Sequence, residues 1–306
     1  MSLVLSVQSS VAYGYVGNRA AMIPLNALGH EVVALNTVSF SNHKGYGDWT
    51  GEVFSTAQLS DLIKGIKARG LFPKIDAVLT GYIGDEELGA LVLETLGDIR
   101  AANPECLYCC DPVMGDVGSG FFVNPRVRDY FKEGSIDKAD IIVPNQFEAS
   151  FLSDIDIRTM ADALRAFDVL HARGIKRIVM TSFQPDDLEP DKISMLLSDR
   201  STAGDQDSKG ALQVTTSQKN RGVFQVTTPR FAMDPMPNGA GDVTAATILA
   251  HLLKGADLRG AVELTAAALH DIFDQTQQDQ RRELNLIRAQ SAFEHPSQSF
   301  EALRVL

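Results

Sequence analysis

The amino-acid sequence predicts an α/β fold, in which a mostly parallel sheet is covered by helices on both faces. Up to Asp191, short apolar and β-branched runs alternate with longer helical patterns. This alternation is typical of parallel strands joined by helical crossovers. Polar residues follow most of the predicted strands, which is where a sheet of this kind binds its ligands.

The elements follow in chain order. The first strand, Ser2–Val7, is expected to end at the polar run Gln8–Ser10, and a helix starts at Asn18 after a glycine-containing turn. Further strands are expected at Glu31–Leu35, Ile75–Leu79, Leu107–Cys110, Ile141–Val143 and Arg177–Thr181. Further helices are expected at Ala57–Arg69, Asp85–Ile99, Met160–Arg173, Ala240–Leu253 and Leu258–Gln275.

The pattern changes after Asp191. Ile193–Leu197 and Gly222–Thr228 predict antiparallel strands, and the segment 198–221 between them is rich in Ser, Asp, Gln, Lys and Gly. We interpret 198–221 as a polar loop insert. Because no repeat or composition shift divides the chain, residues 1–306 are predicted to form one domain with a small β-rich flap.

Composition restricts the class of partner. Of 306 residues, 44% are hydrophobic and 22% are charged, a balance typical of soluble globular proteins. The chain has 28 lysines and arginines against 39 acidic residues, a net charge of −11. A field of that sign repels phosphate backbones and anionic lipid, so we expect neither nucleic acid nor a membrane as partner.

The cysteines and the first residues bear on the compartment. Cys106, Cys109 and Cys110 lack a second pair with ligand spacing, so we interpret them as small hydrophobic residues on or beside a buried strand. Such a cluster suits a reducing compartment. Residues 2–18 carry no charge, are too polar for a membrane span and follow no basic segment. We therefore expect a cytoplasmic protein.

The strongest local signal is Pro237–Asp242, directly before an apolar helix. Gly239 and Gly241 allow backbone N–H groups to converge, and a helix N-terminus adds partial positive charge. This combination predicts an anion site, with Asp242 in the first helical turn beside it. A plain helix cap is the alternative role for Asp242.

A second candidate pair is Asn145 and Glu148, three residues apart after a predicted strand. Oxygen ligands at this spacing suit Mg²⁺ that bridges substrate phosphates. A capping box, with no metal, is the alternative and is favoured if the motif stands alone. The sequence holds no Walker motif and no G-x-G-x-x-G after the first strand, which argues against P-loop and dinucleotide-binding proteins.

Several blocks of the sequence are shared with one known family. They are Ser6–Ser9, Gly14–Ala21, Phe40–His43, Thr80–Tyr82, Asp111–Asp116, Pro144–Glu148, Gly239–Asp242 and Glu283–Leu284. Through them the chain resembles the pyridoxal (vitamin B6) kinases of the ribokinase-like superfamily, essentially from end to end. The resemblance implies a ribokinase-like fold and transfer of the ATP γ-phosphate to the 5′-hydroxyl of pyridoxal, and also of pyridoxine and pyridoxamine.

The resemblance also implies roles for individual residues. Asp242 matches the catalytic base, and the backbone of Gly239, Ala240, Gly241 and Asp242 matches the anion hole. The substrate pocket is implied at Ser9, Val16, Val38, Phe40, His43 and Tyr82. ATP contacts are implied at Asp111, Asp116, Asn145, Glu148, Thr181, Ser182, Met236 and Pro237, with Asp111 and Glu148 near the metal. The implied cofactor is Mg²⁺ with ATP, a monovalent cation such as K⁺ is left open, and family members are usually homodimers.

The sequence departs from the family at a few positions. Ser10 stands where His is usual, Lys44 where Thr is usual, and Val143 where some members have Thr. Phe121 and Phe122 occupy a flap where some members have Cys or Tyr over the substrate. For Lys44 we favour solvent or a salt bridge over contact with a substrate oxygen or a Schiff base with the aldehyde.

Three other functions stay open at this stage. A hydroxymethylpyrimidine kinase of the same superfamily would share the phosphate machinery and differ in the ring pocket. A vitamin B6-binding protein with little turnover would fit the departures, although Asp242, the glycines and the Asn145/Glu148 pair are intact. A sugar or nucleoside kinase is less favoured, because those enzymes usually carry a larger β lid.

Overall fold

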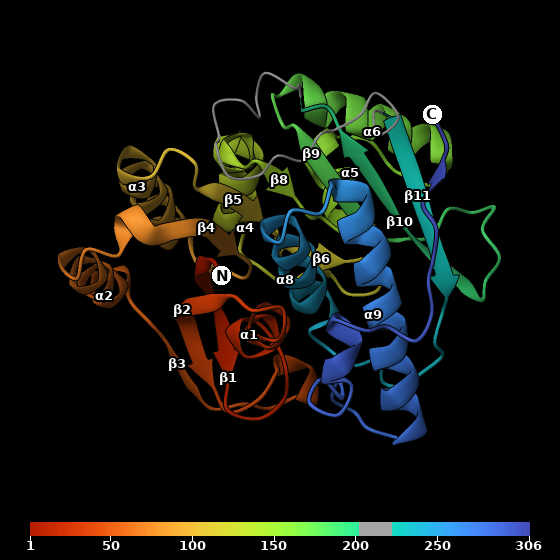
Figure 1. The fold of residues 1–306 in the computed structure, drawn as a ribbon, viewed down its shortest axis with the longest axis horizontal. Helices are drawn as coiled ribbons and strands as arrows, with labels where there is room; N and C mark the ends of the chain where they lie inside the picture. Colours follow the sequence, from red (N-terminus) through yellow and green to blue (C-terminus); the bar gives the residue numbers. More distant parts are fainter. Residues whose placement is uncertain (202–221) are drawn as a thin grey trace.

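The computed structural model describes residues 1–201 and 222–306, and its strands form one ten-stranded sheet (Figure 1). The strand order is β12-β11-β10-β9-β8-β5-β4-β1-β2-β3. A separate pair, β6 (Gly115–Asp116) and β7 (Gly120–Phe121), forms a small antiparallel hairpin. The predicted fold class, a mostly parallel sheet in an α/β protein, is confirmed.

The centre of the sheet is parallel, as predicted. Its strands are β1 (Leu3–Val11), β2 (Glu31–Phe40), β4 (Ile75–Thr80), β5 (Leu107–Cys110), β8 (Ile141–Ile142) and β9 (Arg177–Phe183). Antiparallel pairing adds β3 (Gly51–Val53) at one edge and β10 (Lys192–Asp199), β11 (Gly222–Pro229) and β12 (Leu303–Arg304) at the other. The strands beyond residue 191 thus extend the central sheet.

Helices cover both faces of the sheet, as predicted (Figure 1). One face carries α1 (Asn18–Ala27), α8 (Ala240–Leu253) and α9 (Leu258–Gln278). The other carries α2 (Thr56–Ala68), α3 (Glu86–Ala102), α4 (Pro125–Tyr130), α5 (Gln146–Ser153) and α6 (Met160–Ala172). Two hydrophobic cores result, one for each face. Helix α8 is buried from Val243 to Leu252, which explains why its sequence is apolar all round.

The predicted end of the first strand at Val7 was wrong. Strand β1 continues to Val11, and its pairing with β2 shifts register between Gln8 and Ser10. The shift falls at Ser9, and such an irregularity turns a side chain out of the regular alternation. The extension has polar residues in place of an apolar run, because this part of the strand borders the cavity as well as the hydrophobic core.

The predicted loop 198–221 began too early, because strand β10 continues to Asp199. Ser198 and Asp199 belong to β10 and are buried. Their polar groups are satisfied, since His171 Nε2 lies 2.8 Å from Ser198 Oγ and Arg177 Nε donates to Asp199 Oδ2 at 3.3 Å. Residues 202–221 of the predicted insert lie outside the described residues.

The cysteines lie as expected. Cys106, Cys109 and Cys110 are fully buried on or directly before β5, and they pack in the cores of the two faces. In the described ranges, 1–201 and 222–306, no helix has the length and apolar character that crossing a membrane requires.

Candidate active site

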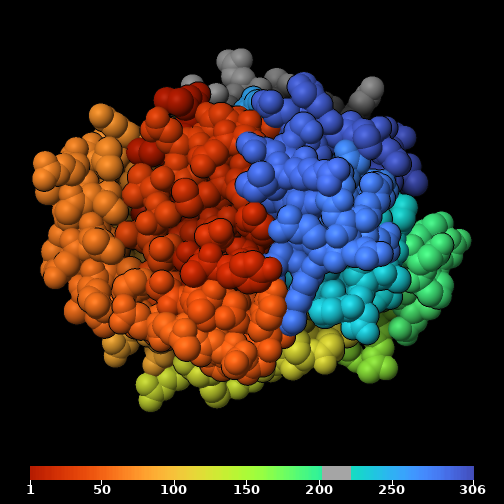
Figure 2. All heavy atoms as spheres, turned by 90° about the horizontal axis from the view of Figure 1, so that it is seen from below, coloured from red at the N-terminus to blue at the C-terminus, as the bar shows by residue number. Residues whose placement is uncertain are grey.

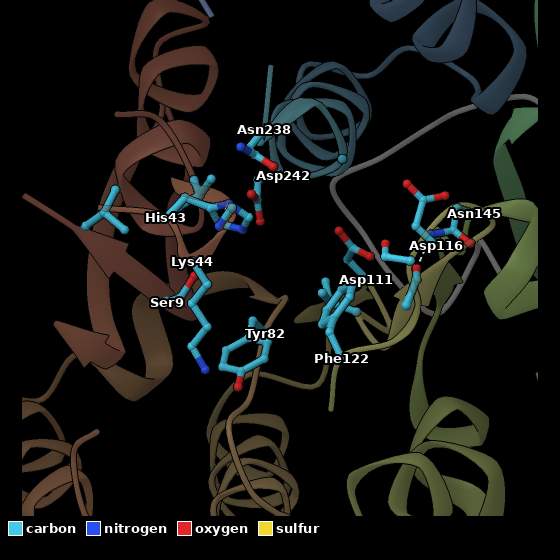
Figure 3. Close-up of a pocket in the computed structure, with 18 of the residues that line it drawn as sticks. Ser9, His43, Lys44, Tyr82, Asp111, Asp116, Phe122, Asn145, Asn238 and Asp242 are labelled. Carbon is cyan, nitrogen blue, oxygen red and sulfur yellow. Dashed lines mark hydrogen bonds between the residues drawn. The ribbon is translucent and has the colours of Figure 1, made fainter. Parts of the chain in front are cut away.

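A cavity of about 580 Å³ opens where the parallel strands end and α8 begins (Figure 3). Its volume is in the range of small-molecule sites. Most of the site residues expected from the sequence line it together. They are Ser9, Val16, Val38, Phe40, His43, Tyr82, Asp111, Asp116, Asn145, Glu148, Thr181, Gly239, Gly241 and Asp242.

The cavity has two chemically different sides (Figure 3). On one side lie Ser9, His43 and Tyr82, from β1, the segment after β2 and the segment after β4. On the opposite side lie Asp111 and Asp116, from the segment after β5 and the β6–β7 hairpin. Asn238 and Asp242 stand between the two sides at the start of α8. A molecule spanning the cavity therefore has its centre at this helix N-terminus.

Helix α8 begins on a glycine with no side-chain cap. Gly239 has φ 89°, and a Cβ there would lie 1.8 Å from the carbonyl oxygen of Tyr15. Both the left-handed backbone and the close approach require glycine at this position. The alternative that Asp242 caps this helix is wrong: its carboxylate accepts the N–H of Gly17, and no side-chain capping bond forms at Gly239.

Two carboxylates of the cavity, Asp242 and Asp111, are destabilised as anions. Burial raises the pKa of Asp242 to about 6, and the hydrogen bond from Gly17 opposes that rise. Burial also raises the pKa of Asp111 well above its usual value, and the nearby charges of Glu148 and Asp242 add to it. With Asp116, four acidic groups line this cavity, which favours the binding of a cation there.

Asn145 and Glu148 form the capping box that the sequence offered as the alternative to a metal pair. Asn145 Oδ1 accepts the N–H of Glu148 and Glu148 Oε2 accepts the N–H of Asn145, both at 2.9 Å. Glu148 Oε1 also accepts the N–H of Met114 at 2.8 Å. Asn145 Nδ2 donates to the carbonyl of Gly115 at 2.8 Å. Both side chains line the cavity, yet their polar atoms hold α5 against the β5–β6 segment.

Asp111 fits a divalent cation better than Glu148 does. Asp111 is 5% exposed, and within residues 1–201 and 222–306 no donor is hydrogen-bonded to its carboxylate. Its Oδ2 faces the backbone of Gly241, where a Cβ would lie 3.9 Å away. Mg²⁺ typically takes one or two carboxylates, with phosphates and waters completing its shell. Among the described residues there is no cluster of three metal-binding side chains, which such a shared site does not need.

The other side of the cavity suits a flat ring. Val16 and Val38 are buried and apolar, and Phe40 and Tyr82 are half-buried aromatic walls. Burial lowers the pKa of His43 and raises that of Tyr82, so both are favoured in their neutral forms. Aromatic walls with a few polar points are typical of heteroaromatic ligand sites.

The residues that depart from the family pattern fall in different places. Lys44, Val143 and Phe122 line the cavity. The Lys44 ammonium lies 5.4 Å from the ring centroid of Phe40 and 5.1 Å from that of Trp49, and the residue is exposed at the rim. In the described part of the chain Lys44 has no salt bridge, and its exposure agrees with the first of the two positions that we favoured, solvent or a salt bridge. Phe121 packs on Phe147 and Phe151, and Ser10 of β1 pairs with Ser39 of β2.

Some expected residues do not line this cavity. They are Ser182, Met236, Pro237 and Ala240. Ser182 is exposed in β9 with φ 53°, and Met236 is 48% exposed in the segment before α8. Sequence reasoning in turn missed six cavity residues: Val11, Gly45, Val113, Gly115, Ser119 and Asn238. Asn238, Val113 and Gly115 lie inside motifs that the sequence analysis had already identified. Their position beside predicted site residues could have indicated that they line the cavity.

Comparison with known proteins now adds to this geometry. A family model described as phosphomethylpyrimidine kinase matches residues 58–282. The pyridoxal kinase PdxY of Rubrobacter xylanophilus is 41% identical over 303 residues, covering 99% of this chain and 97% of the relative. That of Deinococcus radiodurans is 40% identical, covering 99% and 96%. The chain belongs to the pyridoxal kinase family.

Solved structures of this kinase family share the whole fold. The pyridoxal kinase from Leishmania donovani in complex with ADP and pyridoxamine superposes with a TM-score of 0.87 at 31% identity, covering 99% of both chains. The complex of the same enzyme with ADP and ginkgotoxin gives a TM-score of 0.88. Pyridoxal kinases transfer phosphate to an alcohol, which agrees with a cavity that joins an aromatic side to an acidic one.

Proposed function

We propose that this chain transfers the γ-phosphoryl group of ATP to the 5′-hydroxyl of pyridoxal, and also of pyridoxine and pyridoxamine. The observation that carries the proposal is the position of Asp242. Its carboxylate stands at the uncapped N-terminus of α8, between the aromatic and the acidic sides of one cavity. An alcohol on the aromatic side and a phosphate on the acidic side would meet beside it.

Asp242 is proposed as the general base. Phosphoryl transfer needs the hydroxyl proton to leave as the new bond forms, and a base works best when its pKa is close to the operating pH. A pKa raised to about 6 by burial brings Asp242 closer to neutral pH than an exposed aspartate while leaving it mostly ionised. The Gly17 N–H holds the carboxylate in place during the transfer.

The start of α8 is proposed as the anion hole. The first N–H groups of a helix have no partner within the helix, and their dipoles point at whatever anion lies beyond. Gly239 and Gly241 add no side chain that would fill this space, the methyl group of Ala240 packs against the hydrophobic core, and no side chain caps the helix at Gly239. Charge that spreads over the moving phosphoryl oxygens is stabilised there without reorganisation of the protein.

Mg²⁺ is proposed to accompany ATP, near Asp111. When bound, it would neutralise phosphate charge, which is its usual contribution to phosphoryl transfer. Asp111 supplies the free carboxylate, whereas the bonded oxygens of Glu148 favour a role in holding the Gly115 segment and Asn145. Asp116, Asn145, Thr181, Ser182, Met236 and Pro237 stay proposed nucleotide contacts. A requirement for a monovalent cation stays a prediction.

The vitamin is proposed to bind on the aromatic side. Ser9 would hydrogen-bond the pyridine ring, with Val16, Val38 and Phe40 packing on its faces. His43 and Tyr82 would contribute the remaining polar contacts. A homodimer, a single domain over residues 1–306 and a cytoplasmic location stay predictions alongside this assignment.

A hydroxymethylpyrimidine kinase is the second candidate, favoured by the description of the matching family model. Steady-state phosphorylation by Mg-ATP of pyridoxal and of hydroxymethylpyrimidine, measured side by side, separates the two. We expect pyridoxal to be preferred, and Asp242→Ala to lower kcat roughly 10²-fold or more. Asp162→Asn is the matched control, because Asp162 is the third residue of α6 as Asp242 is of α8.

Preference for hydroxymethylpyrimidine would replace the proposed substrate. Absence of turnover with both alcohols would indicate a vitamin B6-binding protein.

A further inference from the structure

The segment that follows α9 contacts two loops beside the cavity, although it is distant from both in the sequence. Glu283 is 3% exposed, and its Oε2 accepts the N–H of Tyr15 at 3.0 Å. Its Oε1 accepts the hydroxyl of Tyr46 at 2.6 Å. The partners are separated from Glu283 by 268 and 237 residues. Figure 2 shows the N-terminal and C-terminal parts of the chain side by side on one face of the molecule.

The neighbouring arginine strengthens one of these contacts. The Arg282 guanidinium lies 3.6 Å from the ring centroid of Tyr46, and its Nη2 donates to the carbonyl of Gly45 at 2.8 Å. Tyr46 and Gly45 belong to the 3₁₀ turn η1 (Lys44–Tyr46), which follows His43. His43, Lys44 and Gly45 all line the cavity. Arg282 and Glu283 thus fix a wall of the proposed vitamin pocket from behind.

The other contact of Glu283 leads to the proposed base. The Tyr15 carbonyl packs against Gly239, where even a Cβ would lie 1.8 Å away. Two residues further on, the N–H of Gly17 donates to the Asp242 carboxylate. Glu283 therefore binds the same turn, Tyr15–Gly17, that contacts both Gly239 and Asp242.

We propose that Glu283 is a positioning residue, which holds the Tyr15–Gly17 turn and the η1 turn against the start of α8. The inference rests on the proposed function, because it concerns the same phosphoryl-transfer site. A buried carboxylate must be hydrogen-bonded, and bonds to a charged acceptor are stronger than neutral ones. Displacement of a reacting group by about 1 Å can cost about 10²-fold in rate. One side chain that fixes both loops therefore acts on substrate binding and on turnover.

A second glutamate provides a matched control. Glu263 Oε1 accepts the N–H of Ala302 at 2.8 Å and the Arg259 Nε–H at 3.0 Å. Glu263 thus also connects the C-terminal segment to α9, yet none of these three residues lines the cavity. A residue that merely anchors the chain end would behave as Glu263 does.

The test is steady-state kinetics with pyridoxal and Mg-ATP varied separately, together with pyridoxal binding in the absence of ATP. Glu283→Ala should raise the pyridoxal KM and lower kcat, each roughly tenfold, and leave the ATP KM unchanged. Tyr46→Phe removes only the hydrogen bond between Glu283 and the η1 turn. It should therefore raise the pyridoxal KM roughly threefold at unchanged kcat. Glu283→Gln can accept the Tyr15 N–H at its carbonyl oxygen and donate its amide N–H to the Tyr46 hydroxyl oxygen, so it should stay within about threefold of wild type.

Several results would overturn the inference. One is a Glu283→Ala variant that keeps the wild-type pyridoxal KM and kcat. Others are an ATP KM that rises as much as the pyridoxal KM, or the same pattern in Glu263→Ala. If Glu283→Ala does not fold, Tyr46→Phe decides by its KM and kcat alone. Should wild type bind pyridoxal without turnover, the proposed function fails, and equal pyridoxal affinity in Tyr46→Phe and wild type would then overturn the inference separately. A wild type that does not bind pyridoxal overturns both.

Discussion

Two helices begin at the cavity, and they begin differently. Helix α5 opens with a complete capping box, in which the Asn145 and Glu148 side chains bond each other's backbone N–H groups. Helix α8 opens on Gly239 in the left-handed region with no side-chain cap, and its Asp242 is bonded elsewhere. The first helix N-terminus is satisfied by the protein itself. The second has no side-chain cap, and we propose that an anionic ligand takes that place; the comparison indicates that a missing cap at a cavity is a signal for function.

The largest effect is expected from a substitution that distorts the start of the uncapped helix α8. Gly239→Ala puts a methyl group 1.8 Å from the Tyr15 carbonyl oxygen at φ 89°, so the turn or the helix must move. We expect turnover of pyridoxal to fall by about 10²-fold or more, together with a lower unfolding midpoint. Gly241→Ala is the contrast, since its Cβ would make an ordinary 3.9 Å contact. An unchanged midpoint in Gly239→Ala would contradict this reading.

A substitution in the capping box of α5 should mainly lower the stability of the protein. Glu148→Ala removes the acceptor of the Met114 and Asn145 N–H groups, which are then left without that partner. The free energy of unfolding should fall by roughly 3 kcal/mol, measured by urea denaturation. Asn145→Asp keeps an acceptor for the Glu148 N–H and loses only the donor to the Gly115 carbonyl, so it serves as the milder comparison. A loss below about 1 kcal/mol in Glu148→Ala would show that the capping box matters little.

The pH dependence of catalysis sharpens the comparison further. A base must be ionised to accept a proton, and burial raises the pKa of Asp242 to about 6. The kcat/KM for pyridoxal should therefore be flat above about pH 6 and fall about tenfold per pH unit below it. A lower limb that begins near pH 4, the usual aspartate range, would mean that burial does not tune this group.

The smallest expected effect is at the cavity rim. Lys44→Thr removes an exposed ammonium that lies over Phe40 and Trp49. A cation–π contact at an exposed site is worth about 0.5–1 kcal/mol. We expect the pyridoxal KM to change less than about fivefold and the ATP KM to stay constant. Trapping of a Lys44 adduct by borohydride in the presence of pyridoxal would instead favour the Schiff base that we discounted.

The sequence was sufficient to predict the sheet and its helices, because elements such as β4, β5 and α8 are buried on all sides and therefore stand out as apolar runs. It also located Asp242, since the glycines and the apolar helix behind them lie within a few residues. It failed where polar residues continue a strand, at Ser9 in β1 and Ser198 in β10, because the neighbouring strand β2 and the His171 partner of Ser198 are distant in the chain. The role of Glu283 was hidden for the same reason, as its contacts span more than two hundred residues.

The central claim is that Asp242 is kept ionised at a cost in stability in order to serve as a base. Its folded pKa of about 6 is raised above the ordinary value of 3.8. The ionised group therefore destabilises the fold at neutral pH, and this cost disappears as the pH falls below both values. Removing the charge should increase stability while abolishing base catalysis.

The most direct measurement is kcat and the free energy of unfolding of Asp242→Asn at pH 7.5, beside wild type. We predict that kcat falls about 10²-fold or more while the free energy of unfolding rises by roughly 2–3 kcal/mol. A variant that keeps kcat within about tenfold of wild type, or that loses stability, would contradict the account.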